Sequence, residues 1–194
     1  SYGKFIIEPL AQGYGHTIGN SLRRVLLSSL EGGAITQVKV ASVRHQFSTL
    51  SGMSEDIVEL ILNLKKVRLI IRGDKPVKLN LDVKGPKEVT AGDIEKAAGV
   101  DIVNEDQILA HLSDAKARLI CKLVAENGVG YSTADERRTS EIGVIPVDAN
   151  FSPVIYVNYN VEATRVGRLT NFDKLTIETT TDGTIKPSDA LKQS

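Results

Sequence analysis

The sequence predicts an α+β protein with mixed or antiparallel sheets and two to three helices. Two segments, residues 13–33 and 54–66, carry apolar residues at helical spacing. Two others, residues 77–84 and 155–163, alternate apolar and polar residues as half-buried strands do. Turns that contain glycine or proline punctuate these segments. Helices and strands are therefore both expected, and nothing in the composition divides the chain into consecutive domains.

The amino-terminal part predicts a strand followed by a helix. Residues 4–10 have a strand pattern, and we expect this strand to pair with the strand that follows the helix. The helix is expected within residues 13–33. Thr17 or His16 is expected to cap its first turn, and the pair Gly32–Gly33 to form a left-handed carboxyl end.

The first helix has apolar residues on more than one face. One stripe at helical spacing consists of Ile18, Leu22, Val25, Leu26 and Leu30. Arg24 and Leu27 lie together on another side of the helix. To cover both faces, the helix must pack against other protein surface on two sides.

A second strand and a second helix are expected next. The strand spans residues 34–43, and Ser54 is expected to cap the helix with Glu55–Asp56 in its first turn, where negative charge suits the helix dipole. The predicted buried stripe is Ile57, Leu60, Ile61 and Leu64. The pair Lys65–Lys66 follows in the last turn.

The rest of the chain predicts strands, loops and a final helix. Strands are expected at residues 77–84, 108–112, 117–125 and 155–163 and from Leu175 onward, loops at 92–106 and 128–143, and a helix from Ser188. We expect a hairpin between strands 108–112 and 117–125 through Ser113–Asp114. The polar segment 128–143 is expected to be a long mobile loop.

Composition argues against several functions. The 194 residues are 41% hydrophobic, and 24 basic residues balance 24 acidic ones, so no overall positive charge attracts nucleic acid. A single cysteine excludes an internal disulfide and fits a reducing, cytoplasmic location. No signal peptide and no apolar run long enough to cross a membrane are present, so no membrane association is expected.

The sequence also offers little for catalysis. His16, His45 and His111 lie far apart without metal-site spacing, so we expect no metal and no cofactor. Cys121 lies on the apolar side of an alternating strand and is expected to be a core residue rather than a nucleophile. No catalytic residue is therefore predicted. The alternative is a small-molecule enzyme or binding module in the β-rich middle of the chain, with Cys121 or His111 as its reactive group.

The chain resembles the amino-terminal domain of the bacterial RNA polymerase alpha subunit. The resemblance begins with HTIGNSLRRVLLSSLEGGAIT at residues 16–36, the signature helix of that family. Further matches, in the family's order, are FIIEPL (5–10), HQFSTLSGMSEDIVELILNLKKV (45–67), GPKEVTAGDI (85–94), GVGY (128–131), VDANFSPV (147–154), NVEATRV (160–166) and TNFDKLTIET (170–179). The resemblance therefore covers nearly the whole chain.

The resemblance implies a non-catalytic assembly subunit of a nucleotidyltransferase complex, the DNA-directed RNA polymerase. It implies a dimerisation domain made of residues 1–31 and 154–194, interrupted by an inserted, mainly β domain of residues 32–153. The implied partners are a second copy of the chain and the beta and beta-prime subunits. The family's separate DNA-binding domain and most of its second dimer helix do not match any part of this chain, so we expect no promoter binding and a weaker dimer.

The resemblance also assigns residues to each contact. The expected dimer interface is Ile18, Leu22, Leu26, Leu30 and Leu191; the expected beta contact is Arg24, Leu27 and Lys65; the expected beta-prime contact is Val147, Arg165 and Arg168. Without the resemblance, Arg24 would be taken for part of a solvated helix face and Lys65 for a cation at a helix end. Residues 168–171 read Arg-Leu-Thr-Asn where the family commonly has Gln-Arg-Thr-Asp, so the charge pattern of the beta-prime contact differs here.

Overall fold

The computed structural model describes residues 1–194, which form two compact units. The first, which we call the end unit, consists of Ser1–Glu31 and Ser152–Ser194. The second, the middle unit, is Gly32–Phe151. The first unit is thus built from both ends of the chain, with the second inserted between them. The α+β class with mostly antiparallel sheets and three helices is confirmed.

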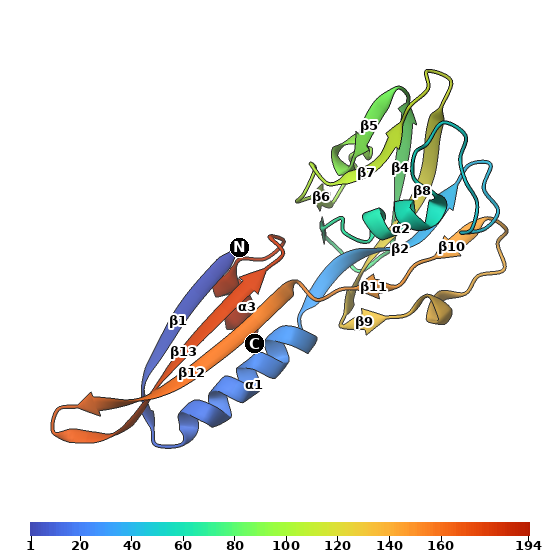
Figure 1. Ribbon diagram of the computed structural model, residues 1–194. Helices are drawn as coiled ribbons and strands as arrows, with labels where there is room; N and C mark the ends of the chain where they lie inside the picture. The colour runs from blue at the N-terminus through green and yellow to red at the C-terminus, as the bar shows by residue number, and fades with distance from the viewer. The chain divides into compact units, whose positions relative to one another are not determined.

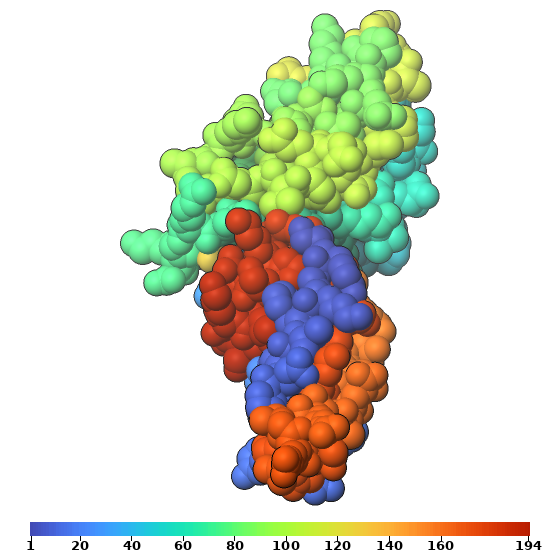
Figure 2. All heavy atoms as spheres, turned by 90° about the vertical axis from the view of Figure 1, so that its left-hand side faces the viewer, coloured from blue at the N-terminus to red at the C-terminus, as the bar shows by residue number.

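The end unit is a three-stranded antiparallel sheet with two helices. The strand order is β1 (Tyr2–Ala11), β13 (Leu169–Thr181), β12 (Val154–Val166), and the helices are α1 (Tyr14–Ser28) and α3 (Pro187–Gln193). Figure 2 shows the first residues, in blue, lying against the last ones, in red and orange. Both helices contribute to one core, made of Leu26, Leu30, Val154, Val157, Leu175, Ile177 and Ala190. The expected pairing of the first strand with the strand after the helix is wrong, because β13 takes that place.

Both ends of α1 differ from the sequence-based expectation. Neither Thr17 nor His16 caps the helix. The N-cap is Gly13, at φ 88°, and the side chain that accepts hydrogen bonds from the first amides of the helix belongs to β13. There, Asp173 Oδ2 accepts hydrogen bonds from the main-chain amides of Gly13 at 2.8 Å and Gly15 at 3.1 Å. A carboxylate from a distant strand therefore replaces a local cap.

The carboxyl end of α1 does not use the glycine pair. The helix ends at Ser28, and Gly32 and Gly33 belong to β2 (Glu31–Val40). Gly33 pairs with Leu69 in the neighbouring strand, and a Cβ at Gly33 would lie 2.9 Å from the Leu69 carbonyl oxygen. Close approach between strands, and not a helix end, explains this glycine.

The middle unit is built around a six-stranded sheet (Figure 1). Its order is β4 (Val77–Lys84), β8 (Arg118–Val129), β2, β3 (Leu69–Ile71), β6 (Val100–Ile102), with β10 (Val144–Pro146) also pairing with β2. Two small sheets pair β5 (Lys87–Thr90) with β7 (Ile108–Leu112) and β9 (Tyr131–Ser132) with β11 (Ala149–Asn150). Helix α2 (Ile57–Leu64) and the short 3-10 helices η1 (Ala91–Asp93) and η2 (Ala134–Arg137) complete the unit.

The core of the middle unit confirms the predicted periodicity. Every member of the predicted α2 stripe is buried, as are the apolar residues of the alternating pattern on β4 from Leu79 to Val83.

The expected hairpin between 108–112 and 117–125 is wrong: β7 pairs with β5, and β8 pairs with β4. Ser54 is not the cap of α2, because Asp56 Oδ1 accepts the hydrogen bond from the Glu59 amide at 2.7 Å. No helix of the chain combines the length and apolarity needed to cross a membrane.

Candidate functional site

The exposed side of α1 carries an arginine with no ionic partner. Asn20, Arg24 and Leu27 are exposed there, and Leu27 keeps 36% of its accessible surface. We call these three residues the α1 outer face. The Arg24 side chain makes no ion pair, and its main-chain carbonyl oxygen accepts a hydrogen bond from the Ser28 hydroxyl at 2.6 Å. An unpaired arginine beside exposed apolar surface has the composition of a protein-binding hot spot.

Close packing on the other side holds this face in place. A Cβ at Gly15 would lie 2.6 Å from Val161 Cγ1, and one at Gly19 would lie 2.6 Å from Tyr159 Cδ2. The two glycines therefore let α1 approach β12 more closely than alanine would allow. With the Asp173 bonds at its start, the helix is a rigid support for Arg24.

The five residues expected at a dimer interface fall into two groups. Leu26 and Leu30 are 0% and 5% exposed, within the core of the end unit. Ile18, Leu22 and Leu191 pack against that core but remain partly exposed. Leu26 and Leu30 therefore support the surface from below, since their side chains are already covered, whereas the other three offer area that a second chain can bury.

Lys65 lies at the end of α2 and is engaged within the chain. Its ammonium nitrogen is 3.8 Å from Asp148 Oδ2, in an ion pair whose side chains are 31% and 39% exposed. Asp148 also accepts a hydrogen bond from the Ala134 amide at 2.7 Å, which is the largest influence lowering the pKa of this carboxyl. Such exposed pairs contribute at most about 1 kcal/mol, so Lys65 can exchange its partner at little cost.

Val147 is a core residue and not a surface one. Its side chain is 2% exposed, and its main chain donates to the Thr36 carbonyl at 2.8 Å and accepts from Arg137 Nη1 at 2.7 Å. Arg137 also lies 3.4 Å from Glu126 and 5.7 Å from the centre of the Phe151 ring. Val147 therefore has no side-chain surface for the expected beta-prime contact. Arg137 ties the predicted loop 128–143 to the sheet, a role that no local sequence signal indicated.

The tip of the β12–β13 hairpin presents apolar and basic side chains together. Val166 pairs with Leu169 across the turn at Gly167, which has φ 60°, and these two apolar residues are 42% and 60% exposed. Arg165 Nε donates to the Gly167 carbonyl at 2.6 Å, while Arg168 is exposed without an ion pair. We call residues 165–169 the hairpin tip; Figure 1 shows it extending past the start of α1. The sequence did not predict that Val166 and Leu169 are exposed, because alternation alone does not show which strand ends remain accessible to solvent.

The groups considered for catalysis are not assembled into a site. Cys121 is 1% exposed, and burial raises the pKa of its thiol to about 12, so the thiolate nucleophile is not formed near neutral pH. His111 is exposed and lies 2.5 Å from Glu55 Oε1 and 3.2 Å from Glu88 Oε2. The hydrogen bond with Glu55 raises the pKa of His111. No group of three or more His, Cys, Asp or Glu residues is placed to hold a metal ion.

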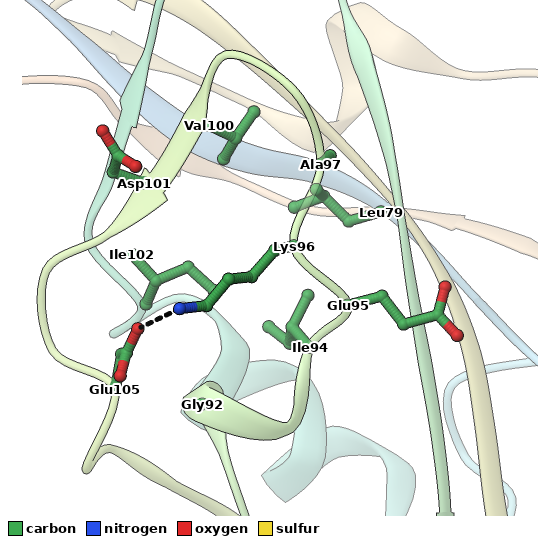
Figure 3. Close-up of a pocket in the computed structure, with 10 residues that line it drawn as sticks. All are labelled: Leu79, Gly92, Ile94, Glu95, Lys96, Ala97, Val100, Asp101, Ile102 and Glu105. Atoms are coloured by element: carbon green, nitrogen blue, oxygen red, sulfur yellow. Dashed lines mark ion pairs between the residues drawn. The ribbon is translucent and has the colours of Figure 1, made fainter.

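One hollow of the middle unit is shown in Figure 3, and it is small. Its volume is about 80 Å³, and its lining includes Ile94, Val100 and the ion pair of Lys96 with Glu105 at 3.9 Å. Neither Cys121 nor His111 lines it. Small-molecule sites usually span about 300 Å³ or more, so this hollow is too small for one. A larger hollow of the middle unit, described below, is also lined by neither Cys121 nor His111, so neither hollow supports a small-molecule site that uses these groups.

The fold is that of an α+β protein in which one compact unit is inserted into another, with basic and apolar side chains exposed on α1 and on the hairpin tip. Comparison with known protein families identifies the class more closely. Residues 38–152 match the family described as the RNA polymerase Rpb3/RpoA insert domain. The chain belongs to the bacterial RNA polymerase alpha subunit family.

Curated relatives extend the match to the whole chain. DNA-directed RNA polymerase subunit alpha of Symbiobacterium thermophilum is 53% identical over 192 residues, which are 98% of this chain and 61% of the relative. The subunits of Roseiflexus castenholzii and Herpetosiphon aurantiacus are each 50% identical, over 100% and 98% of this chain and 60% and 58% of their own lengths. The chain thus spans about 60% of the length of the curated relatives it matches.

Proposed function

We propose that the chain is an assembly scaffold of a bacterial DNA-directed RNA polymerase. In this role it pairs with a second copy of itself and holds the beta and beta-prime subunits. Family membership supports the polymerase context, since the relatives carry the name of its alpha subunit. The observation that carries the docking role is the α1 outer face, with its unpaired Arg24 beside exposed Leu27.

Docking of the beta subunit is assigned to Arg24 and Leu27, with Lys65 as a further contact. The guanidinium of Arg24 has five donors and no acceptor in its own chain, so a carboxylate or carbonyl of a partner can satisfy it without breaking an internal ion pair. Leu27 supplies adjacent apolar area. Lys65 contributes less, because it must first leave Asp148.

Pairing of two copies is assigned to the end unit, which serves as the dimerisation domain. Ile18, Leu22 and Leu191 keep exposed area on α1 and α3, and a two-fold axis would bring the same residues of both chains together. The beta-prime contact is assigned to the hairpin tip through Arg165 and Arg168. Val166 and Leu169 add the apolar surface of that contact.

The scaffold acts by geometry. Holding two large subunits on one dimer raises their effective concentration for each other without any chemical step on this chain. Catalytic residues, metal and cofactor then belong to the partners, and the place of action is the bacterial cytoplasm. Promoter binding is not assigned to the residues described here.

Light scattering on a size-exclusion column, with the chain alone and mixed with its cognate beta subunit, tests this proposal. The chain alone should elute at twice 21.0 kDa, and the mixture should hold two copies and one beta subunit. Arg24→Ala should weaken beta binding by about 2 kcal/mol, or about thirtyfold, as hot-spot truncations do. Arg23→Ala is the matched control, being the neighbouring exposed arginine, also without an ion pair, and should leave the affinity within about twofold. Equal losses in the two variants, or no complex with beta at all, would contradict the proposal.

A further inference from the structure

Three lysines gather on the solvent side of the large sheet in the middle unit. Lys39, Lys78 and Lys122 come from the adjacent strands β2, β4 and β8. The residues next to them in sequence, among them Val38 and Leu79, are buried on the opposite side, so the pleat directs all three lysines outward. We call these three residues the lysine face.

The lysine face borders a hollow of about 390 Å³. The hollow is lined by Gln37, Val38, Lys39, Lys78, Asn80, Lys122, Leu123, Val124, Glu141 and Val144. Its size falls in the range of ligand sites, unlike that of the smaller hollow in Figure 3. The floor is a sheet and therefore rigid, which suits a site for a bound segment.

The hollow has more positive than negative charge. Glu141 is the only carboxylate among its lining residues, against three lysines. Lys39 Nζ donates to Glu141 Oε1 at 2.7 Å, whereas Lys78 and Lys122 have no carboxylate within ion-pair distance. The nearest acid along β4, Asp82, is already held by Arg118 at 2.6 Å. Two positive charges therefore stay uncompensated in a chain whose formal net charge is zero.

Glu141 shows what kind of group the face accepts. It does not belong to the sheet: it precedes β10, and its side chain is 63% exposed. Its pKa is lowered chiefly by the hydrogen bond from Lys39, and more weakly by the charges of Lys78 and Lys122. A carboxylate at this position therefore interacts with all three lysines.

We propose that the lysine face binds an acidic peptide segment of a partner protein, whose carboxylates take the place of Glu141 and pair with Lys78 and Lys122. A peptide fits better than nucleic acid for two reasons. The lining contains no aromatic side chain on which a base could stack, and three lysines are few for a phosphate backbone. Two uncompensated charges require a segment with at least two acidic residues. The inference does not depend on the polymerase role.

The test uses the whole 194-residue chain and fluorescein-labelled hexaglutamate, with binding followed by fluorescence anisotropy. Binding should weaken as salt rises from about 50 to about 200 mM, because exposed charges are screened. The double variant Lys78→Gln/Lys122→Gln should bind about tenfold more weakly. The matched control Lys84→Gln/Lys116→Gln removes the same charge from exposed lysines that do not line the hollow, and should bind within about twofold of the unchanged chain.

Two further measurements complete the test. Glu141→Gln should tighten hexaglutamate binding about two- to fivefold, because it removes the internal carboxylate that competes for Lys39. A fluorescein-labelled hexathymidylate should bind more weakly than hexaglutamate. Equal affinities of the two double variants, no effect of Glu141→Gln, or tighter binding of the oligonucleotide would each overturn the proposal.

Discussion

Replacement of Asp173 by alanine should destabilise the end unit by about 2 kcal/mol. Asp173 accepts hydrogen bonds from the amides of Gly13 at 2.8 Å and Gly15 at 3.1 Å, and the N-cap residue itself provides no side-chain hydrogen bond. Loss of a helix cap costs about 0.5 to 2 kcal/mol, and loss of a negative charge at a helix start about 0.3 to 1 kcal/mol. Because Asp173 is only half-buried, the sum is taken near the middle of that range, at about 2 kcal/mol.

Urea unfolding followed by circular dichroism measures this loss. With an m-value of about 2 kcal/mol/M, the midpoint should fall by about 1 M. Asp173→Asn, which keeps one acceptor oxygen, should lose about half as much. Asp74→Ala is the control: Asp74 is exposed and makes no hydrogen bond or ion pair, so its loss should change stability by less than about 0.5 kcal/mol. If Asp173→Ala and Asp74→Ala unfold at the same urea concentration, the carboxylate does not stabilise α1 and the reasoning fails.

Three other outcomes are expected. Gly19→Ala should cost about 1 to 3 kcal/mol in urea unfolding, although alanine favours helices, because its Cβ would lie 2.6 Å from Tyr159 Cδ2; an unchanged midpoint would mean that the ring moves freely. Cys121, whose pKa is raised to about 12 by burial, should not react with a thiol reagent at about pH 8 until urea unfolds the chain, and rapid native reaction would revive the nucleophile alternative. The pKa of His111 is raised by its hydrogen bond with Glu55, so its stabilising effect is present below the unfolded pKa of about 6.5 and disappears as pH rises through the folded value. The urea midpoint should therefore fall more between about pH 6 and about pH 9 in the unchanged chain than in His111→Gln, and parallel profiles would contradict this.

Local patterns were sufficient to predict the helices and strands that bury one regular face against the core. The α2 stripe from Ile57 to Leu64 and the alternation of β4 were both recognised from the sequence, and the structure buries the same residues. Periodicity reports which side of an element is covered, since burial of apolar area is the main favourable term in folding. It does not report what covers that side. For this reason the pairing of β7 with β5, and of β8 with β4, was missed.

Candidate site residues show the same division. Arg24 and Leu27 were placed on one exposed face by helical spacing alone, and they lie there. Val147 and Lys65 were assigned by resemblance, and the structure buries the first and pairs the second with Asp148. The lysine face had no signal in the sequence, because its three members lie on strands far apart in the chain and meet only in the sheet.

The sequence by itself determined the α+β class, the family, the buried stripes and the exposed side of α1, because each of these depends on residues within a few positions of one another or on matching motifs. Only the tertiary structure decided what caps α1, why Gly33 must be a glycine, which strands pair, and where positive charge collects. Those features depend on contacts such as Asp173 with Gly13, 160 positions apart, where two groups meet because the whole fold brings them together. Local propensities do not predict such a long-range contact. Its contribution to the free energy of folding depends on both groups together, and the contact forms only when the chain between them has folded.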